Sequence, residues 1–216
     1  MALKASGDFP VYFARHGETI YNAQGRYQGS RDDSPLTELG RKQAHEVAFI
    51  LRDFISLQSP PCFVSSPLGR ARITMEIVLG VLGLPSDAYT TDERMVEIDL
   101  GEWSGRHVHA VAANDRARWD ARERDKWNIP APGGESYAMV AARAASWFSE
   151  LTRETVVISH GAFGRILRGL YLGLSWQEMA TMDEPQGVVF RLQQGTIARI
   201  EPPLPVALFD DPAPAP

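Results

Sequence analysis

Two apolar runs in this chain each end at a histidine, and the neighbouring residues are of types that suit phosphate chemistry. Residues 11–14 are followed by Arg15 and His16, and residues 155–159 are followed by His160. Short β-favouring runs that stop abruptly at polar residues predict buried strands. In open α/β sheets, ligands bind in the crevice outside the carboxyl ends of the strands. We therefore expect both histidines and Arg15 to lie at one sheet edge, facing a cleft.

Arginine and histidine together can supply what phosphoryl transfer requires, which is positioning and charge stabilisation more than covalent rearrangement. Arg15, and Arg70 near the start of a predicted helix, offer planar guanidinium groups that bind phosphate oxygens in pairs. Backbone N–H groups at strand and helix ends add to this attraction. A neutral imidazole is a competent nucleophile at physiological pH, and His16 has no metal-ligand partner at a suitable local spacing.

Strand-like and helix-like segments alternate along the chain. The residue pattern predicts a helix capped by Thr37 and stopped by Pro60, helices over 69–82, 135–152 and 164–172, strands over 62–65 and 88–92, and a terminal hairpin over 188–200. Residues 17–36 are predicted to be a long functional loop. The alternation predicts an α/β fold, a three-layer α/β/α sandwich with a mainly parallel sheet.

Length and composition favour one globular domain with an acidic surface. The chain has 216 residues, of which 44% are hydrophobic and 23% charged, and these values are ordinary for a globular protein. We expect a single domain over 1–201, with a helical insertion over the site at about 104–130, and a Pro/Ala-rich tail over 202–216. The net charge of −5 argues against general binding of nucleic acid or anionic membranes, but it allows a local basic pocket for a small anionic substrate.

Other features exclude further classes of protein. The single cysteine, Cys62, rules out an internal disulfide framework. No apolar stretch approaches about 18 residues, and residues 1–9 lack the hydrophobic segment of a signal peptide, so we expect a cytoplasmic protein that does not bind membranes. His107 and His109 invite a metal interpretation, but two histidines without a third ligand are more often solvated, and no metal site is expected.

Four motifs, in order, resemble those of the histidine phosphatase superfamily, which includes the cofactor-dependent phosphoglycerate mutases. They are Arg15-His16-Gly17-Glu18-Thr19 with Asn22, Ser65-Ser66-Pro67-Leu68-Gly69-Arg70-Ala71, Glu97 before Leu100-Gly101-Glu102-Trp103-Ser104-Gly105, and Ser159-His160-Gly161. The resemblance covers about residues 10–170 and implies a phosphoglycerate mutase-like fold.

The resemblance also implies roles for individual residues. His16 would become phosphohistidine, and His160 would bind phosphoryl oxygens beside both arginines, with Asn22 adding a polar contact. Glu97 would protonate the leaving oxygen and then activate water, although Glu93, Asp99 and Glu102 are close competitors. No cofactor is implied, and a homodimer would be consistent with the family.

Departures from the mutase pattern favour a phosphatase. Mutases carry Arg and Tyr where this chain has Ile98 and Leu100, and Asn where it has Ala162. Gln28-Gly29 and the turn over 132–136 resemble the small phosphatases of the superfamily, so Gln28, Gly29 and Ala162 join Asn22 as expected substrate-binding residues. The hypothesis is a metal-independent phosphomonoesterase acting on a small phosphorylated metabolite. The alternatives are a cofactor-dependent phosphoglycerate mutase and a non-catalytic module that binds phosphorylated ligands.

Overall fold

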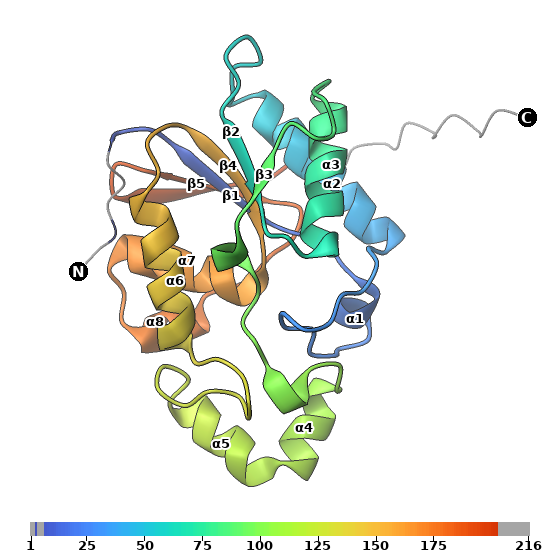
Figure 1. Cartoon of the computed structure of the whole chain (residues 1–216), viewed down its shortest axis with the longest axis vertical. Helices are drawn as coiled ribbons and strands as arrows, with labels where there is room; N and C mark the ends of the chain where they lie inside the picture. Colours follow the sequence, from blue (N-terminus) through green and yellow to red (C-terminus); the bar gives the residue numbers. More distant parts are fainter. Residues whose placement is uncertain (1–2, 4–6, 203–216) are drawn as a thin grey trace, which may run out of the picture.

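A computed structural model describes residue 3 and residues 7–202, so the expected tail lies outside the described residues from position 203 onward. Within them, six strands form one sheet in the order β3-β2-β4-β1-β5-β6 (Figure 1). The strands are β1 (Val11–Arg15), β2 (Cys62–Ser65), β3 (Thr90–Thr91), β4 (Thr155–Ser159), β5 (Val189–Gln193) and β6 (Thr196–Ile200). Strands β3, β2, β4 and β1 are parallel, and β5 and β6 run antiparallel to their neighbours. The predicted mainly parallel sheet is confirmed.

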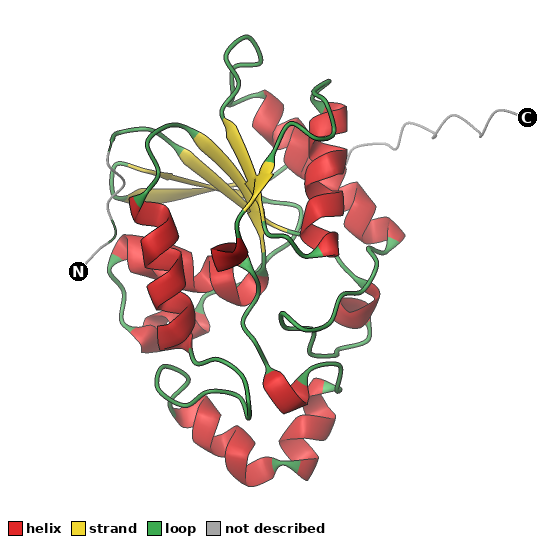
Figure 2. Cartoon of the chain, in the orientation of Figure 1, coloured by secondary structure: helices red, strands yellow, loops and turns green. Residues whose placement is uncertain are grey.

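Helices cover both faces of the sheet, as the three-layer prediction requires (Figure 2). Because side chains alternate along a strand, Tyr12 and Ala14 of β1 pack with α2 (Glu38–Arg52) and α3 (Gly69–Val81). Val11 and Phe13 pack on the opposite face with α6 (Tyr137–Ser149) and α7 (Gly161–Leu172). Two buried cores result, one on each side of the sheet.

The central strand pair brings the histidines together. Strands β1 and β4 are parallel neighbours, with Arg15 opposite Ser159. The backbone N–H of His16 donates to the Ser159 carbonyl at 2.9 Å, which extends the ladder by one residue past the strand end. His16 and His160 therefore leave the sheet side by side at its carboxyl edge.

Two helices, α4 (Val108–Asn114) and α5 (Arg116–Arg124), lie within the segment expected as an insertion. They sit together at the lower end of the molecule in Figure 1, apart from the helices that flank the sheet. The remaining helical segments are α1 (Ile20–Ala23), α8 (Trp176–Thr181) and two 3₁₀ turns at Glu93–Met95 and Gly101–Trp103. No helix within residues 7–202 is both long enough and apolar enough to cross a membrane.

Some element predictions were wrong in detail. The predicted loop over 17–36 contains α1, which is held by a capping box between Thr19 and Asn22. Helix α2 ends at Arg52, well before Pro60, because the residues after it, including Asp53 and Ser56, favour helices weakly. The apolar pattern of α3 predicts a buried face of Ile73, Ile77, Val78 and Val81, of which only Val78 is buried. The buried side chains are Arg70, Ala71, Thr74, Met75, Val78 and Leu79. That helix is apolar around much of its circumference, which makes the face hard to assign by periodicity.

Candidate active site

One nitrogen of His16 is committed to a backbone hydrogen bond. Its Nδ1 lies 2.7 Å from the Gly17 carbonyl oxygen. A carbonyl oxygen can only accept, so Nδ1 carries the proton and Nε2 keeps its lone pair. Nε2 in turn accepts from Arg70 Nε at 3.3 Å. Burial, with the nearby charges of Arg70 and Arg15, holds the pKa of His16 well below its usual value, so the imidazole is neutral at physiological pH.

His160 lies against His16, with the ring centroids 5.2 Å apart in an edge-to-face arrangement. Its side chain is fully buried, and Nε2 lies 2.7 Å from the Ser66 hydroxyl. Its Nδ1 is buried and has no hydrogen-bond partner. Burial, the charge of Arg70 and the neighbouring His16 also lower the pKa of His160 well below its usual value.

Arg70 is buried, with only 1% of its surface exposed, and its guanidinium is held by several hydrogen bonds. It lies in the first turn of α3, where its guanidinium donates to the carbonyls of Asp32 and Gly29 at 3.0 and 2.7 Å and pairs with the Asp33 carboxylate at 3.1 Å. Burial lowers the pKa of Arg70, and the nearby carboxylates of Glu97 and Asp33 oppose that shift. The loop before α2 therefore fixes a cation against Nε2 of His16.

Arg15 is held from the other side by the segment that precedes β5. Its Nη1 donates to the Glu184 carbonyl at 2.7 Å, while its buried Nε has no partner. The Glu184 carboxylate pairs with Arg165 at 2.8 Å. Burial raises the pKa of Glu184, and the adjacent Arg165 and Arg15 restrain that rise. Gln186 donates to the His16 carbonyl at 3.1 Å, so this segment supports the backbone of His16 as well.

Glu97 lies at the N-terminus of α7. Its carboxylate accepts from the backbone N–H groups of Ala162 and Phe163, each at 3.2 Å, and from Ile98 at 2.9 Å. Helix α7 begins at Gly161, three residues before the predicted start, because a carboxylate from a distant segment caps it. The cap could not be read from local sequence.

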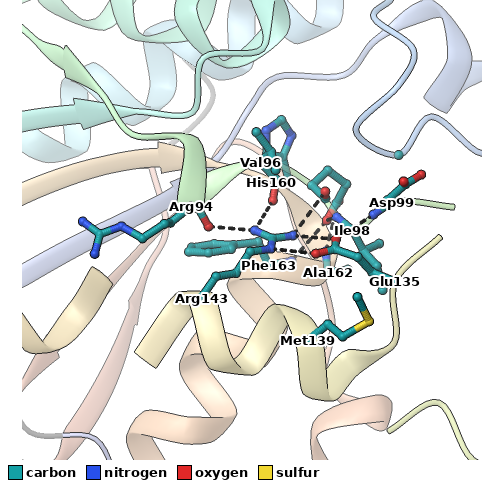
Figure 3. Close-up of polar contacts among 12 residues, drawn as sticks. Arg94, Val96, Ile98, Asp99, Glu135, Met139, Arg143, His160, Ala162 and Phe163 are labelled. Carbon is teal, nitrogen blue, oxygen red and sulfur yellow. Dashed lines mark hydrogen bonds and ion pairs between the residues drawn. The ribbon is translucent and has the colours of Figure 1, made fainter. Parts of the chain in front are cut away.

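Arg143 fixes the backbone that carries Glu97. Figure 3 shows it reaching from α6 toward residues 94–97, where it donates to the carbonyls of Arg94, Val96 and Glu97 at 2.7, 2.6 and 3.3 Å. It also pairs with Glu135 at 3.0 Å. The carboxylate of Glu97 is thus positioned by a half-buried cation as well as by the helix it caps.

All the predicted site residues except His160 line one cavity of about 250 Å³. Its wall includes Arg15, His16, Arg70 and Glu97 together with all four residues expected to bind substrate, Asn22, Gln28, Gly29 and Ala162. His160 lies just behind His16 and is not part of the wall. Sequence reasoning missed Arg122, Tyr137, Arg165 and Glu184, which also line the cavity. They come from the insertion, from α6, from α7 and from the segment before β5, and none carries a local motif.

The predicted competitors of Glu97 lie elsewhere. Glu93, Asp99 and Glu102 are absent from the cavity wall, and Glu102 is exposed and paired with Arg118. His107 and His109 are exposed, with ring centroids 5.3 Å apart. Within the part of the chain that the structure describes, no group of three or more His, Cys, Asp or Glu side chains could hold a metal ion.

An α/β/α sandwich that brings two neutral histidines and two arginines to the carboxyl edge of its sheet has the fold and the groups of a phosphoryl-transfer protein. A sequence model of the histidine phosphatase superfamily (branch 1) matches residues 11–196. The chain belongs to this superfamily and is an enzyme of its phosphatase type.

Individual relatives agree with this family. The chain is 33% identical over 170 residues to the probable phosphoglycerate mutase GpmB of Yersinia pestis, a match that covers 76% of this chain and 75% of that protein. The crystal structure of the alpha-ribazole phosphatase from Shigella flexneri has the same fold, with a TM-score of 0.75 at 23% identity over 90% of this chain and 96% of that one. The mycobacterial glucosyl-3-phosphoglycerate phosphatase is similar at a TM-score of 0.71 and 29% identity, over 90% and 98%.

Proposed function

We propose that this chain is a metal-independent phosphomonoesterase that cleaves a small phosphorylated metabolite through a phosphohistidine on His16. The observation that carries the proposal is the hydrogen bond from His16 Nδ1 to the Gly17 carbonyl, which places the ring proton on Nδ1 and leaves an unprotonated Nε2, facing Arg70 Nε at 3.3 Å, as the atom that attacks phosphorus. The lowered pKa of His16 keeps Nε2 unprotonated at physiological pH. Attack forms the N–P bond and expels the ester oxygen.

The site contains hydrogen-bond donors without partners that could bind phosphoryl oxygens. Arg15 Nε and His160 Nδ1 are buried without partners, and buried polar groups normally have hydrogen-bond partners. The Ser66 hydroxyl accepts from the Leu68 N–H and can donate its own proton to His160 Nε2. His160 Nδ1–H is then left to donate to phosphate. The guanidinium groups of Arg15 and Arg70 would stabilise the negative charge on the phosphoryl oxygens during transfer.

Glu97 is the proposed proton carrier. In the first step its carboxylic acid gives a proton to the departing alkoxide, and in the second its carboxylate takes a proton from the water that attacks the phosphohistidine. Phosphate and neutral His16 are regenerated, so protons and charge balance over the cycle. The support is that Glu97 lines the same cavity as His16 and is held there by Ala162, Phe163 and Ile98.

The mutase alternative rests on the similarity to the probable phosphoglycerate mutase of Yersinia pestis. Against it, Ile98, Leu100 and Ala162 are apolar parts of the cavity wall at positions where mutases carry polar side chains. A mutase must also keep water from the phosphohistidine, whereas a phosphatase must admit it. The glucosyl-3-phosphoglycerate phosphatase that resembles this chain was solved with vanadate, which suggests a similar phosphoryl pocket here.

The test is hydrolysis of p-nitrophenyl phosphate with excess chelator, beside 3-phosphoglycerate with a bisphosphoglycerate primer. We expect phosphate release that the chelator leaves unchanged, no isomerisation, and an alkali-stable phosphoenzyme that the variant His16→Asn does not form. Isomerisation with little phosphate release would instead support the mutase. Binding of phosphate without turnover of any ester would favour the non-catalytic module.

A further inference from the structure

Gln186 contacts two residues of the candidate site without lining the cavity itself. Its Nε2 donates to the His16 carbonyl at 3.1 Å and to Asn22 Oδ1 at 3.3 Å. His16 and Asn22 are both part of the cavity wall, and Gln186 is not. An amide nitrogen carries two hydrogens, so these bonds use both donors of the Gln186 side chain. Gln186 therefore supports the wall from outside the cavity.

The contact with the backbone of His16 fixes the direction of the Gln186 amide. The His16 carbonyl oxygen can only accept a hydrogen bond, so the amide atom that lies 3.1 Å from it must be the nitrogen. An inverted Gln186 would place its own oxygen against that carbonyl, and neither oxygen would have a donor. The inverted amide is thus excluded by the chemistry of the contact.

The same reasoning fixes the amide of Asn22. Its Oδ1 accepts from Gln186 Nε2 at 3.3 Å and from the Thr19 backbone N–H at 3.2 Å. Two donors at one end of the amide require the oxygen there, so Nδ2 lies at the other end. Among the residues that the structure describes, none accepts a hydrogen bond from Asn22 Nδ2. The wall therefore contains an amide donor whose orientation is set and which has no acceptor.

Ion pairs hold the chain just before Gln186. Asp183 pairs with Arg168 of α7 at 3.5 Å and with Arg199 of β6 at 2.6 Å. The next residue, Glu184, also pairs with α7, as described above. Both elements pack on the sheet, so the position of Gln186 is set independently of Asn22. A supporting residue that is itself held in place can restrict the side chain that it contacts.

We propose that Gln186 is a positioning residue that directs the amide nitrogen of Asn22 toward the phosphoryl group of the substrate. The inference rests on the proposed function, because it takes phosphate to bind beside His16. Asn22 Nδ2–H donates to a phosphoryl oxygen, and Gln186 acts on phosphate only through Asn22. An inverted Asn22 would instead present Oδ1 to that oxygen and repel it, since neither atom has a proton to donate.

Binding of orthophosphate to four proteins tests this coupling. Calorimetry compares the wild type with Gln186→Met, Asn22→Ala and the double variant. We expect Asn22→Ala to weaken binding by about 10- to 100-fold, the range for a hydrogen bond to a charged group. Gln186→Met should weaken it by about 3- to 10-fold, because the Asn22 amide then keeps only the bond from Thr19. In the Asn22→Ala background, Gln186→Met should change the affinity less than about twofold.

The matched control is Gln193→Met. Gln193 is half-buried at the end of β5 that lies beside the start of β1, away from His16, so this change should leave phosphate affinity unaltered. An unchanged affinity in Gln186→Met, or an equal loss with and without Asn22, would overturn the inference. The second result would show that Gln186 acts through the His16 backbone or through the fold as a whole.

Nuclear magnetic resonance on the wild type tests the same contacts if Gln186→Met does not fold. In the ¹⁵N–¹H spectrum, both hydrogens of Gln186 Nε2 should exchange with solvent more slowly than those of Gln193. Orthophosphate should shift the Asn22 Nδ2 signals, which are absent from Asn22→Ala, and leave the Gln193 signals in place. Rapid exchange of both Gln186 hydrogens, or Asn22 signals that phosphate does not move, would contradict the inference.

Phosphate binding also separates this inference from the proposed function. If the wild type binds orthophosphate but hydrolyses neither p-nitrophenyl phosphate nor any other ester, the proposed function fails, and the binding data still decide the role of Gln186. If it hydrolyses esters and Gln186→Met binds phosphate as the wild type does, the inference alone fails. A wild type that binds no orthophosphate would overturn the inference as well.

Discussion

A single backbone contact decides which nitrogen of His16 is available for chemistry. The Gly17 carbonyl holds Nδ1–H, so Nε2 is the acceptor that meets Arg70 at 3.3 Å. Arg70 Nε–H donates to the lone pair on His16 Nε2. This hydrogen bond requires a neutral ring, because protonated Nε2 has no lone pair. Burial and the cationic neighbours both favour the neutral ring, since both lower the pKa of His16.

The role of Glu97 can be tested through the leaving group. Glu97→Gln removes the transferable proton, so we expect kcat for an alkyl phosphate to fall by about 10²- to 10⁴-fold. p-Nitrophenolate leaves without being protonated, so kcat for p-nitrophenyl phosphate should fall by less than about tenfold. The measurement is kcat for both esters in each protein. Glu102→Gln, at the exposed competitor, serves as the control, and equal losses on the two esters would contradict the general-acid role.

The buried histidines should make stability depend on pH. Burial, with Arg70 and His16, lowers the pKa of His160 in the folded state. Below the ordinary pKa of about 6.5, the unfolded chain binds the proton and the folded chain does not, so stability is lost as the pH falls. Each such histidine contributes about 1.4 kcal/mol per pH unit in this window.

Denaturant unfolding between about pH 7.5 and pH 5.5 measures this linkage. The free energy of unfolding of the wild type, relative to His160→Gln, should stay constant above about pH 6.5 and fall below it. The control variant His45→Gln, at an exposed position on α2, keeps His160, so its free energy of unfolding should fall with pH as that of the wild type does. A difference between wild type and His160→Gln that does not vary with pH would show that His160 titrates alike in both states.

At the scale of elements, the placement of α7 against β1 controls the site. Gly164 lies on the buried face of α7, and a Cβ at that position would come within 2.2 Å of the Phe13 ring. The missing side chain lets the helix approach the sheet closely enough for its N-terminus to reach Glu97. Gly80, in the last turn of α3, has nothing within 4 Å of the same position.

Alanine substitutions should separate these two glycines. Gly164→Ala forces Phe13 or the helix to move and should destabilise the fold by about 1–3 kcal/mol. Gly80→Ala meets no obstacle and should stabilise it by up to about 1 kcal/mol, because alanine favours helices. Urea unfolding of the three proteins gives both values. A neutral Gly164→Ala would show that α7 does not need this close approach.

Local patterns predicted the elements that act locally. The Thr37 cap, the hairpin turn at Gln194 and Gly195, and the two strands tipped by histidines are confirmed, since each depends on neighbours in sequence. The start of α7 depends on Glu97, more than sixty residues away, and was placed three residues late. Helix α8 was not predicted at all, because its six residues carry no long apolar period.

The residues of the candidate site also fall into those that a local motif marks and those that only the fold reveals. His16, Arg15, Arg70 and His160 were found because motifs mark them, and the structure brings them together. Arg122 and Glu184 have no motif, and their importance comes from burial and from which partners they have or lack. The insertion contains four arginines, Arg116, Arg118, Arg122 and Arg124, which no motif distinguishes. The fold shows that Arg122 faces the cavity, that Arg116 and Arg118 form ion pairs at the surface, and that Arg124 is exposed.

At the scale of the whole molecule, the groups that we propose bind phosphate come from segments that are distant along the chain. Arg15 is the last residue of β1, Arg70 lies in the first turn of α3, and His160 directly precedes α7. A bound phosphate would contact all three, and each comes from an element that packs on the sheet. A ligand that binds the folded state alone raises its stability by mass action. Phosphate should therefore stabilise the entire chain against unfolding and not merely order one loop.

Orthophosphate at about 100 times its dissociation constant should add about 2.7 kcal/mol to the free energy of unfolding. For a domain of this size that corresponds to a rise in Tm of roughly 5–10 °C. Thermal unfolding in phosphate, with sodium chloride at equal ionic strength as the reference, measures the shift. Arg15→Gln should lose most of it, because Arg15 Nε is an unpartnered donor and the charge-assisted bond is lost. An equal shift in Arg15→Gln would mean that phosphate stabilises the protein from another site, and the proposed phosphoryl pocket would have to be moved.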